Sequence, residues 1–151
     1  MGGTPYQAAG FRLDSPLEAG DIVYKTAAAV TILKGEALHD DGAGLVTNAV
    51  TALAATFAGI AGADCASGGS CMVIVPNSKN SFWVPVATNT TLAAITDVGE
   101  IVDLEAAGTV DLTDNTLVAW GFVVDEIDVS AAAVAASSKG YVKGRFWPQP
   151  Q

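Results

Sequence analysis

The chain has 151 residues, of which 50% are hydrophobic and only 15% are charged, so it can bury a substantial core as one compact domain. Its net charge of −9 at pH 7 disfavours nucleic acid and anionic membrane surfaces as partners. No apolar run reaches the roughly 20 residues that a membrane-spanning helix needs. The many small and β-branched residues favour short strands and turns, and therefore a mainly β fold.

Residues 1–19 are predicted to form an extended N-terminal arm. Gly, Pro and Ala separate three isolated apolar anchors, Tyr6, Phe11 and Leu13, which follow no helical or strand period. Such anchors stay ordered only where another surface covers them. That surface is either the chain's own domain or, as we favour, a neighbouring subunit or binding partner. The three anchors are therefore candidate docking residues.

Residues 20–78 are predicted to form a first β unit, with strands near 21–25, 30–33, 45–47 and 72–75. The segment 48–58 suits either a helix or extended chain. Within this unit a Ser-Gly-Gly-Ser turn separates Cys65 from Cys71. This spacing fits neither a redox nor a zinc motif. Cysteines that flank a hairpin turn can form a disulfide, and the alternative is a pair of reduced thiols in a protein made in the cytoplasm.

Residues 79–151 are predicted to form a second β unit, and the two units together form one compact domain. Its strands are expected near 82–86, 101–104, 117–124 and 141–147, followed or separated by turns. In the last strand, alternation places one set of side chains on a common face. These are Tyr141, Lys143, Arg145 and Trp147. Arg145 and Trp147 are further candidate residues for docking on another subunit or a binding partner.

The two units also resemble each other weakly, in a recurring order of a Gly-acid-Ile-Val run, a Gly-aliphatic strand and a closing strand. The matched stretches are 20–23 with 99–102, 59–60 with 121–122, and 69–76 with 140–148. We interpret this order as an internal duplication of a small β-barrel unit.

The sequence offers little chemistry. It has a single histidine, and it contains neither a GxSxG nucleophile motif nor a nucleotide-binding glycine loop, so we predict no enzyme, no metal and no cofactor. Nine acidic residues and no basic ones lie between 97 and 128. They could supply a carboxylate pair for hydrolysis, but a solvated acidic face is the favoured interpretation.

Several runs follow a pattern typical of one family. They are Gly20-Asp21-Ile22-Val23, Ile32–Leu38, Phe57–Ala61, and Trp83–Ala87 followed by Val98–Val102. In these runs the chain resembles the small decoration proteins of tailed-phage capsids, the cement or head-stabilising proteins of the β-tulip type. The resemblance implies small β-barrel or β-tulip units. It also implies a homotrimer that binds the outside of the expanded head and stabilises contacts between major capsid proteins.

If the resemblance holds, the protein is made in the host cytoplasm and works on the virion surface. The N-terminus has neither the basic region nor the apolar core of a secretory signal, in keeping with this. An alternative from another class is a sugar-binding or adhesive β-domain of a phage tail or surface appendage. Trp83, Trp120 and Trp147 would support it if they surrounded a shallow groove.

Overall fold

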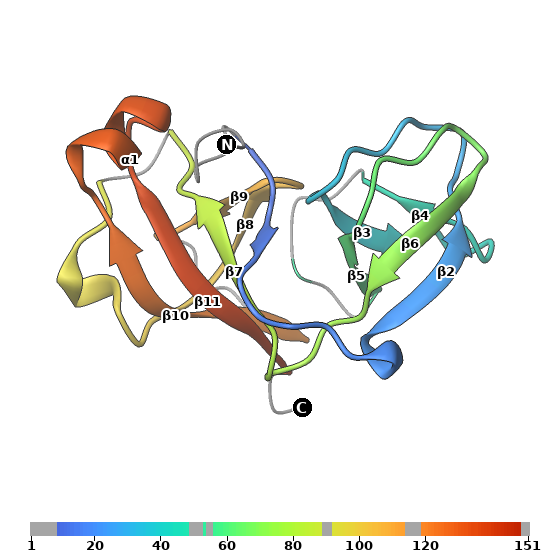
Figure 1. Ribbon diagram of the computed structural model, residues 1–151, viewed down its shortest axis with the longest axis horizontal. Coiled ribbons are helices and arrows are strands. Elements are labelled where there is room, and N and C mark those ends of the chain that lie inside the picture. The colour runs from blue at the N-terminus through green and yellow to red at the C-terminus, as the bar shows by residue number, and fades with distance from the viewer. Residues whose placement is uncertain (1–8, 49–52, 54–55, 89–91, 114–118, 149–151) are drawn as a thin grey trace.

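The computed structural model describes residues 9–48, 53, 56–88, 92–113 and 119–148. The fold is mainly β, as predicted, and consists of two antiparallel sheets that form two lobes side by side (Figure 1). The first lobe contains β2 (Ile22–Thr26), β3 (Ala37–Asp40), β4 (Val46–Thr47), β5 (Phe57–Ala61) and β6 (Ser70–Ile74). The second contains β7 (Ser81–Pro85), β8 (Ile101–Ala106), β9 (Thr109–Asp111), β10 (Trp120–Asp128) and β11 (Tyr141–Pro148).

Three short helical segments and one strand complete the described elements. They are η1 (Ala19–Asp21), η2 (Ile95–Asp97), α1 (Ala131–Ala136) and β1 (Arg12–Leu13). The Ala-rich stretch that follows β10 thus forms a short helix, which Ser130 caps by accepting a hydrogen bond from the backbone of Ala133. Most of the segment 48–58, ambiguous in the sequence, lies outside the described residues, and its end forms the start of β5.

Neither sheet is a closed barrel, so the prediction of barrels is corrected. The first sheet has the order β2-β6-β5-β3-β4, and among the described residues its two ends meet only at a single parallel bridge between Ala27 and Val46. The second has the order β7-β11-β10-β8-β9, with β1 added beyond β7, and a single parallel bridge joins Val86 to Val110. The chain after β2 and after β7 therefore curls each sheet without completing a hydrogen-bonded ladder.

The two lobes have the same strand order and the same register, position by position. Ile22 faces Ile74 across β2 and β6, and Ser81 faces Arg145 across β7 and β11. Ala37 faces Ile60 in the first lobe, as Ile101 faces Val123 in the second. The bridge residues Ala27 and Val46 likewise correspond to Val86 and Val110. The internal duplication that the sequence indicates is therefore present in the topology.

The residue alignment predicted for this duplication is only partly right. Gly69 and Gly140 are equivalent, because their carbonyl groups accept hydrogen bonds from the bridge residues Ala27 and Val86. Gly99, however, corresponds to Gly35, which shares its φ of 92° and precedes β3 as Gly99 precedes β8. Gly20 instead lies in η1 and has no such positive φ. The matched Gly-acid-aliphatic runs at 20–23 and 99–102 therefore belong to different places in the two lobes.

The main hydrophobic core is shared between the lobes. It contains the first-lobe residues Ala37, Phe57, Ile60 and Ile74 together with the interior of the second lobe. A smaller cluster, which includes Ile32, Leu38 and both cysteines, fills the first lobe itself. The central strand β5 of the first lobe is thus buried on both faces, one against the lobe's own interior and the other against the second lobe, whereas the edge strand β2 stays largely exposed.

Phe11 of the N-terminal arm lies at the centre of this shared core. Its side chain is only 3% exposed, and its ring contacts Phe82, Phe122 and Phe146 at centroid distances of 6.2, 5.5 and 5.2 Å. The backbone holds it on both sides, because Gly10 donates to Gly108 of the second lobe and Phe11 to Gly35 of the first. The described part of the arm therefore packs on its own domain, and Figure 1 shows it between the lobes.

A second connection is polar and lies where the arm meets the linker between the lobes. The buried carboxylate of Asp21 accepts hydrogen bonds from the backbone of Glu18 and from Asn77, and it forms an ion pair with Lys79 at 3.1 Å. Nearby, Ser15 donates to the buried Asn80. The backbone hydrogen bond from Glu18 is the main cause that lowers the pKa of Asp21, and the bond to Lys79 adds to it.

We predict that Phe11→Ala destabilises the whole molecule. The substitution leaves a cavity among three phenylalanine rings, and truncation of a buried phenylalanine typically costs about 3–5 kcal/mol. Urea unfolding measured by circular dichroism tests this. Leu13→Ala, at a half-buried position of the same arm, is the matched control and should cost clearly less. Equal stability of Phe11→Ala and the wild type would remove the arm from the core.

We also predict that Asp21 stabilises the fold in a pH-dependent way. Its pKa is lower in the folded state than the ordinary value of about 3.9 in an unfolded chain. Its contribution is therefore complete above about pH 5 and is lost as the pH falls below the unfolded-state pKa and through the folded-state pKa. The difference in unfolding free energy between the wild type and Asp21→Asn should shrink from about pH 5 towards pH 3. A difference that stays constant across this range would contradict the role of the charge.

Candidate docking surface

The structure separates the residues predicted for docking. Tyr6 lies outside the described residues, and Phe11 is buried in the core, so Phe11 cannot serve as a docking residue as predicted. Leu13 is half-buried and packs against the same core, as a neighbour of Phe82. Arg145 and Trp147 lie on β11, and both point to the opposite face of the second sheet, away from the core. The arm and the closing strand therefore do not form one joint site.

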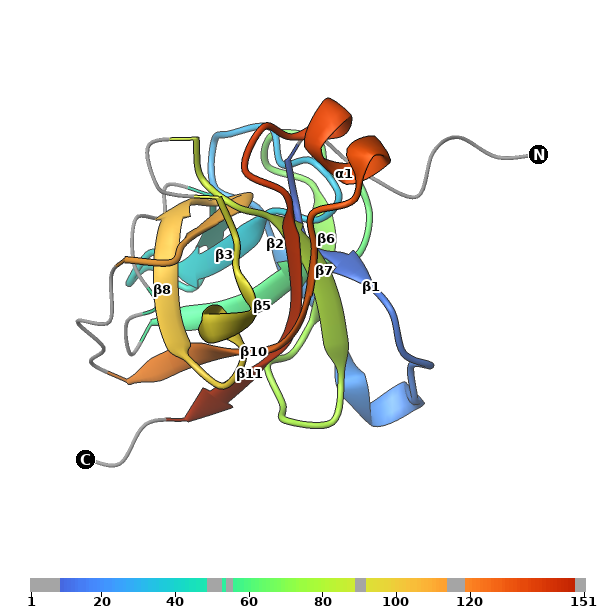
Figure 2. The ribbon, with the colours of Figure 1, turned by 90° about the vertical axis from the view of Figure 1, so that its left-hand side faces the viewer.

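The outer face of the second lobe is organised by a row of cross-strand neighbours on β8, β10 and β11. Ile101 faces Val123, and Val123 faces Arg145, and all three are half-buried. We call these residues the second-lobe row. The next row on the inside, formed by Val102, Phe122 and Phe146, is fully buried, as the period of two in a strand requires. Figure 2 looks onto this lobe.

Arg145 is fixed on this face by two contacts. Its Nε and Nη2 donate to the two carboxylate oxygens of Asp125 at 2.8 and 3.1 Å, and its guanidinium lies 5.6 Å from the ring centre of Trp147. The hydrogen bonds to Asp125 raise the pKa of Arg145 above its already high ordinary value, so it stays charged. Trp147 keeps 44% of its surface exposed. The result is a rigid aromatic and cationic feature at the end of β11.

Lys143 is fixed in a similar way one step along the same strand. Its Nζ pairs with Glu126 at 2.6 Å and with Asp14 at 3.3 Å, and it lies 5.8 Å from the ring centre of Trp83. The hydrogen bond to Glu126 is the main cause that raises the pKa of Lys143. The predicted common face of the closing strand is thus present for Lys143, Arg145 and Trp147. Tyr141 is the exception, because it is 2% exposed.

Ile101, Val123 and Asp125 were not singled out from the sequence. Val123 belongs to an apolar run that predicts a fully buried strand, yet the strand alternates between buried Phe122 and Val124 and the half-buried Val123. The position of Val123 opposite Arg145 would have identified it as part of this face. That position depends on how β10 pairs with β11, which the local sequence does not show.

The acidic stretch 97–128 is predicted to form a solvated face, but in the structure not all of its acids are exposed. Asp103 is 4% exposed, and its carboxylate accepts hydrogen bonds from the backbone of Leu53 at 2.6 Å and of Leu104 at 2.8 Å. It therefore connects a first-lobe segment to β8. Asp125 and Glu126 form ion pairs, and Asp114 lies outside the described residues.

A cavity of about 380 Å³ lies between the arm and the first lobe. Arg12 and Lys34 lie at its wall, and among the described residues neither has an ion-pair partner. Leu13, Leu17, Met72 and Ile74 supply its apolar lining. None of the described residues that line this cavity is a tryptophan. Trp83 and Trp120 are half-buried elsewhere: Trp83 lies under Lys143, and Trp120 packs against Phe57. The described lining of this cavity therefore does not supply the exposed tryptophans that the sugar-binding alternative needs.

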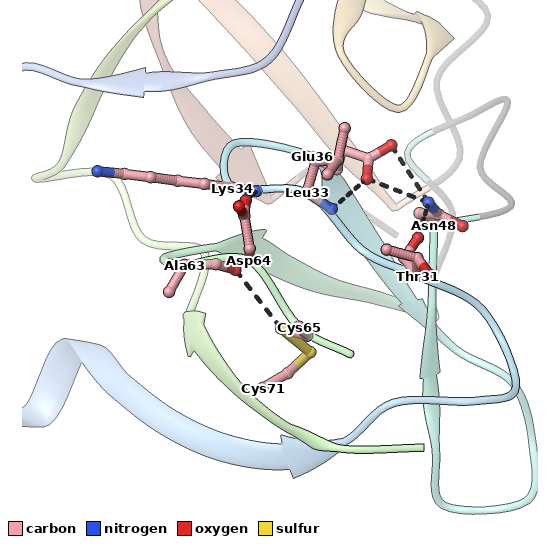
Figure 3. Close-up of a disulfide and its surroundings, with 9 residues drawn as sticks. All are labelled: Thr31, Leu33, Lys34, Glu36, Asn48, Ala63, Asp64, Cys65 and Cys71. Carbon is pink, nitrogen blue, oxygen red and sulfur yellow. Dashed lines mark hydrogen bonds between the residues drawn. A yellow bond between two sulfur atoms is a disulfide. The ribbon is translucent and has the colours of Figure 1, made fainter. Parts of the chain in front are cut away.

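Cys65 and Cys71 form a disulfide across the hairpin turn, with their Cα atoms 5.4 Å apart (Figure 3). Cys65 also forms an antiparallel bridge with Ile32. Beside it, the backbone of Lys34 donates to Asp64, and Glu36 accepts from the backbone of Leu33 and from Asn48. The Lys34 side chain points away from this cluster in Figure 3. The disulfide is therefore part of the small core of the first lobe and does not line a reactive cleft.

Comparison with protein-family models, curated proteins and solved structures finds no match to the chain. Among the described residues, no helix is long and apolar enough to cross a membrane.

We predict that removal of the disulfide destabilises the protein without changing the fold. The double variant Cys65→Ala/Cys71→Ala should lose about 2 kcal/mol, since the bond closes only a short loop. Thermal unfolding of the wild type with and without a reductant gives the matched measurement, and the variant should not respond to the reductant. A wild type that also fails to respond would show that the thiols are not paired in solution.

Proposed function

We propose that this chain is a structural virion protein. In this proposal it decorates the outside of an expanded phage head as a homotrimer and stabilises contacts between major capsid proteins. The observation that carries the proposal is the outer face of β11, where Trp147 is exposed beside an Arg145 that Asp125 holds in place. An exposed tryptophan next to a fixed arginine is typical of the residues that dominate protein–protein contacts.

The runs that resemble decoration proteins fit this proposal through the fold. Ile32–Leu38 leads into and includes part of β3, Phe57–Ala61 is β5, and the two strands pair in the first lobe. Two of their aliphatic positions, Ala37 and Ile60, pack in the core shared by the lobes. The resemblance therefore supports a common architecture, while the candidate docking residues lie on the other lobe.

Charge and exposed apolar residues also support the proposal. A net charge of −9 disfavours contact with packaged DNA and keeps the free protein soluble. Several large apolar side chains are nevertheless exposed on the described surface, among them Ile95 at 75% and Leu92 at 49% around η2. Side chains of this kind are available for contacts between proteins.

Cosedimentation with phage heads tests the proposal. The protein should pellet with expanded heads that lack it, and it should not pellet with unexpanded procapsids. Trp147→Ala should weaken binding by at least about tenfold, because an aromatic anchor is lost. The matched control is Tyr24→Ala, which removes a 70% exposed aromatic side chain from the first lobe and should bind as the wild type does.

Two results would contradict the proposal. One is a wild-type protein that binds neither form of the head. The other is binding to polysaccharide-coated beads that Trp147→Ala abolishes, which would favour the adhesive alternative.

A further inference from the structure

The cavity between the arm and the first lobe gathers cations that the rest of the chain leaves unpaired. Of the seven basic side chains in the sequence, Arg12, Lys34 and Lys139 are the three without an ion-pair partner among the described residues. Two of these three, Arg12 and Lys34, line this one cavity, and none of the described residues that line it is acidic. The cavity is therefore a positively charged site in a chain whose net charge is −9.

The acids closest to this site along the chain are directed elsewhere. Asp14 follows Leu13, and its carboxylate pairs with Lys143 of the second lobe at 3.3 Å. Asp64 accepts a hydrogen bond from the backbone of Lys34 at 2.7 Å, but the Lys34 side chain extends away from Asp64 (Figure 3). Neither carboxylate therefore neutralises the two cations of the cavity, which suit an anionic group of a ligand.

The rest of the cavity lining is largely apolar. Leu13 and Leu17 of the arm line it together with Met72 and Ile74 of β6. The volume of about 380 Å³ lies within the range of binding pockets. Gly62 leaves part of this space open, because a side chain there would collide with Met72. The cavity therefore suits a ligand that combines a negative charge with aliphatic groups.

The strand beside the cavity also has a free backbone edge. β1 is the outermost strand of its sheet, and its Leu13 lies opposite Phe82 of β7. The backbone of Asp14 donates to Ser81 at 2.8 Å, so Leu13 and Phe82 form a non-hydrogen-bonded pair of the antiparallel ladder. The N–H and C=O of Leu13 consequently point away from β7, and among the described residues nothing bonds to them. A free donor and acceptor on one edge residue are what an added strand requires.

We infer that this cavity binds an extended acidic segment of another protein. The segment pairs with the backbone of Leu13 as a strand added to β1, and its aliphatic side chains enter the apolar part of the cavity. A carboxylate of the segment pairs with Arg12 and Lys34. A fatty acid would satisfy the cations and the apolar lining but would leave the backbone of Leu13 unpaired. The inference does not depend on the decoration role, because the site lies apart from the outer face of β11.

Peptide binding to the full chain tests the inference. The probe is a fluorescein-labelled peptide in which valine and glutamate alternate, and the wild type should bind it with a Kd of about 100 µM or tighter. The same peptide with glutamine in place of glutamate should bind at least about tenfold more weakly. Arg12→Gln and Lys34→Gln should each weaken binding of the acidic peptide by about fivefold or more. Lys139→Gln is the matched control, because it removes the third unpaired cation, outside the cavity lining, and should bind as the wild type does.

Hydrogen exchange measured by NMR on the unmodified chain provides a test that needs no variant. In the free protein the amide of Leu13 should exchange faster than that of Asp14, which is bonded to Ser81. The acidic peptide should slow exchange at Leu13 by at least about tenfold, because the added strand takes up its N–H.

Four results would overturn the inference. They are no binding of the acidic peptide, equal binding of the glutamine peptide, unchanged binding by Arg12→Gln and Lys34→Gln, and bound peptide that leaves exchange at Leu13 unchanged. Dodecanoate that displaces the peptide without slowing exchange at Leu13 would also overturn it and assign the cavity to a small amphiphile. No phage heads are present in these measurements, so their failure is distinct from failure of the decoration role.

Discussion

The burial of three first-lobe residues, Ala37, Ile60 and Ile74, against the second lobe is the contact on which the rest of the structure depends. Three aliphatic side chains on the outside of a curled sheet cannot remain in water at low cost, and the second lobe and the arm remove them from it. Phe11 fills the space that remains, and backbone hydrogen bonds tie this part of the arm to Gly108 of the second lobe and to Gly35 of the first. Asp103 and Asp21 then fix the alignment with hydrogen bonds that apolar packing alone would not provide.

Duplication explains why this contact forms once within the chain. The two lobes share their register, but equivalent positions carry different side chains: Ile74 corresponds to Arg145, and Ala37 to Ile101. Ile74 makes the row of Ala37, Ile60 and Ile74 entirely apolar, so this face of the first lobe is stable only when it is buried. Arg145, at the equivalent position of the second lobe, leaves a face that tolerates water and also retains apolar area from Ile101 and Val123.

The sequence was sufficient for the fold class and for the alternation that brings Arg145 and Trp147 to one face of β11. It was insufficient wherever the answer depended on packing between lobes. Phe11 has the same apolar side chain whether it covers a neighbour or its own core, and only the pocket formed by Phe82, Phe122 and Phe146 decides between them. The runs at 20–23 and 99–102 look alike because a glycine and an acid often precede a strand, whereas equivalence is set by pairing, which local sequence does not record.

The distribution of charge bears on how copies of the chain interact with one another. Four of its cations, Lys25, Lys79, Lys143 and Arg145, are held in ion pairs with acids of the same chain, so the excess of acidic residues dominates its field. Copies at a distance therefore repel one another, and the net charge opposes non-specific association. At physiological salt this repulsion is screened beyond about 8 Å. Whether two copies bind is therefore decided by the side chains that come into direct contact. Arg145 and Lys143 are already paired, with Asp125 and with Glu126 and Asp14, so opposite charge does not draw one copy to another through β11. A contact made through the outer face of β11 must therefore rely on apolar side chains that stay exposed, such as Trp147.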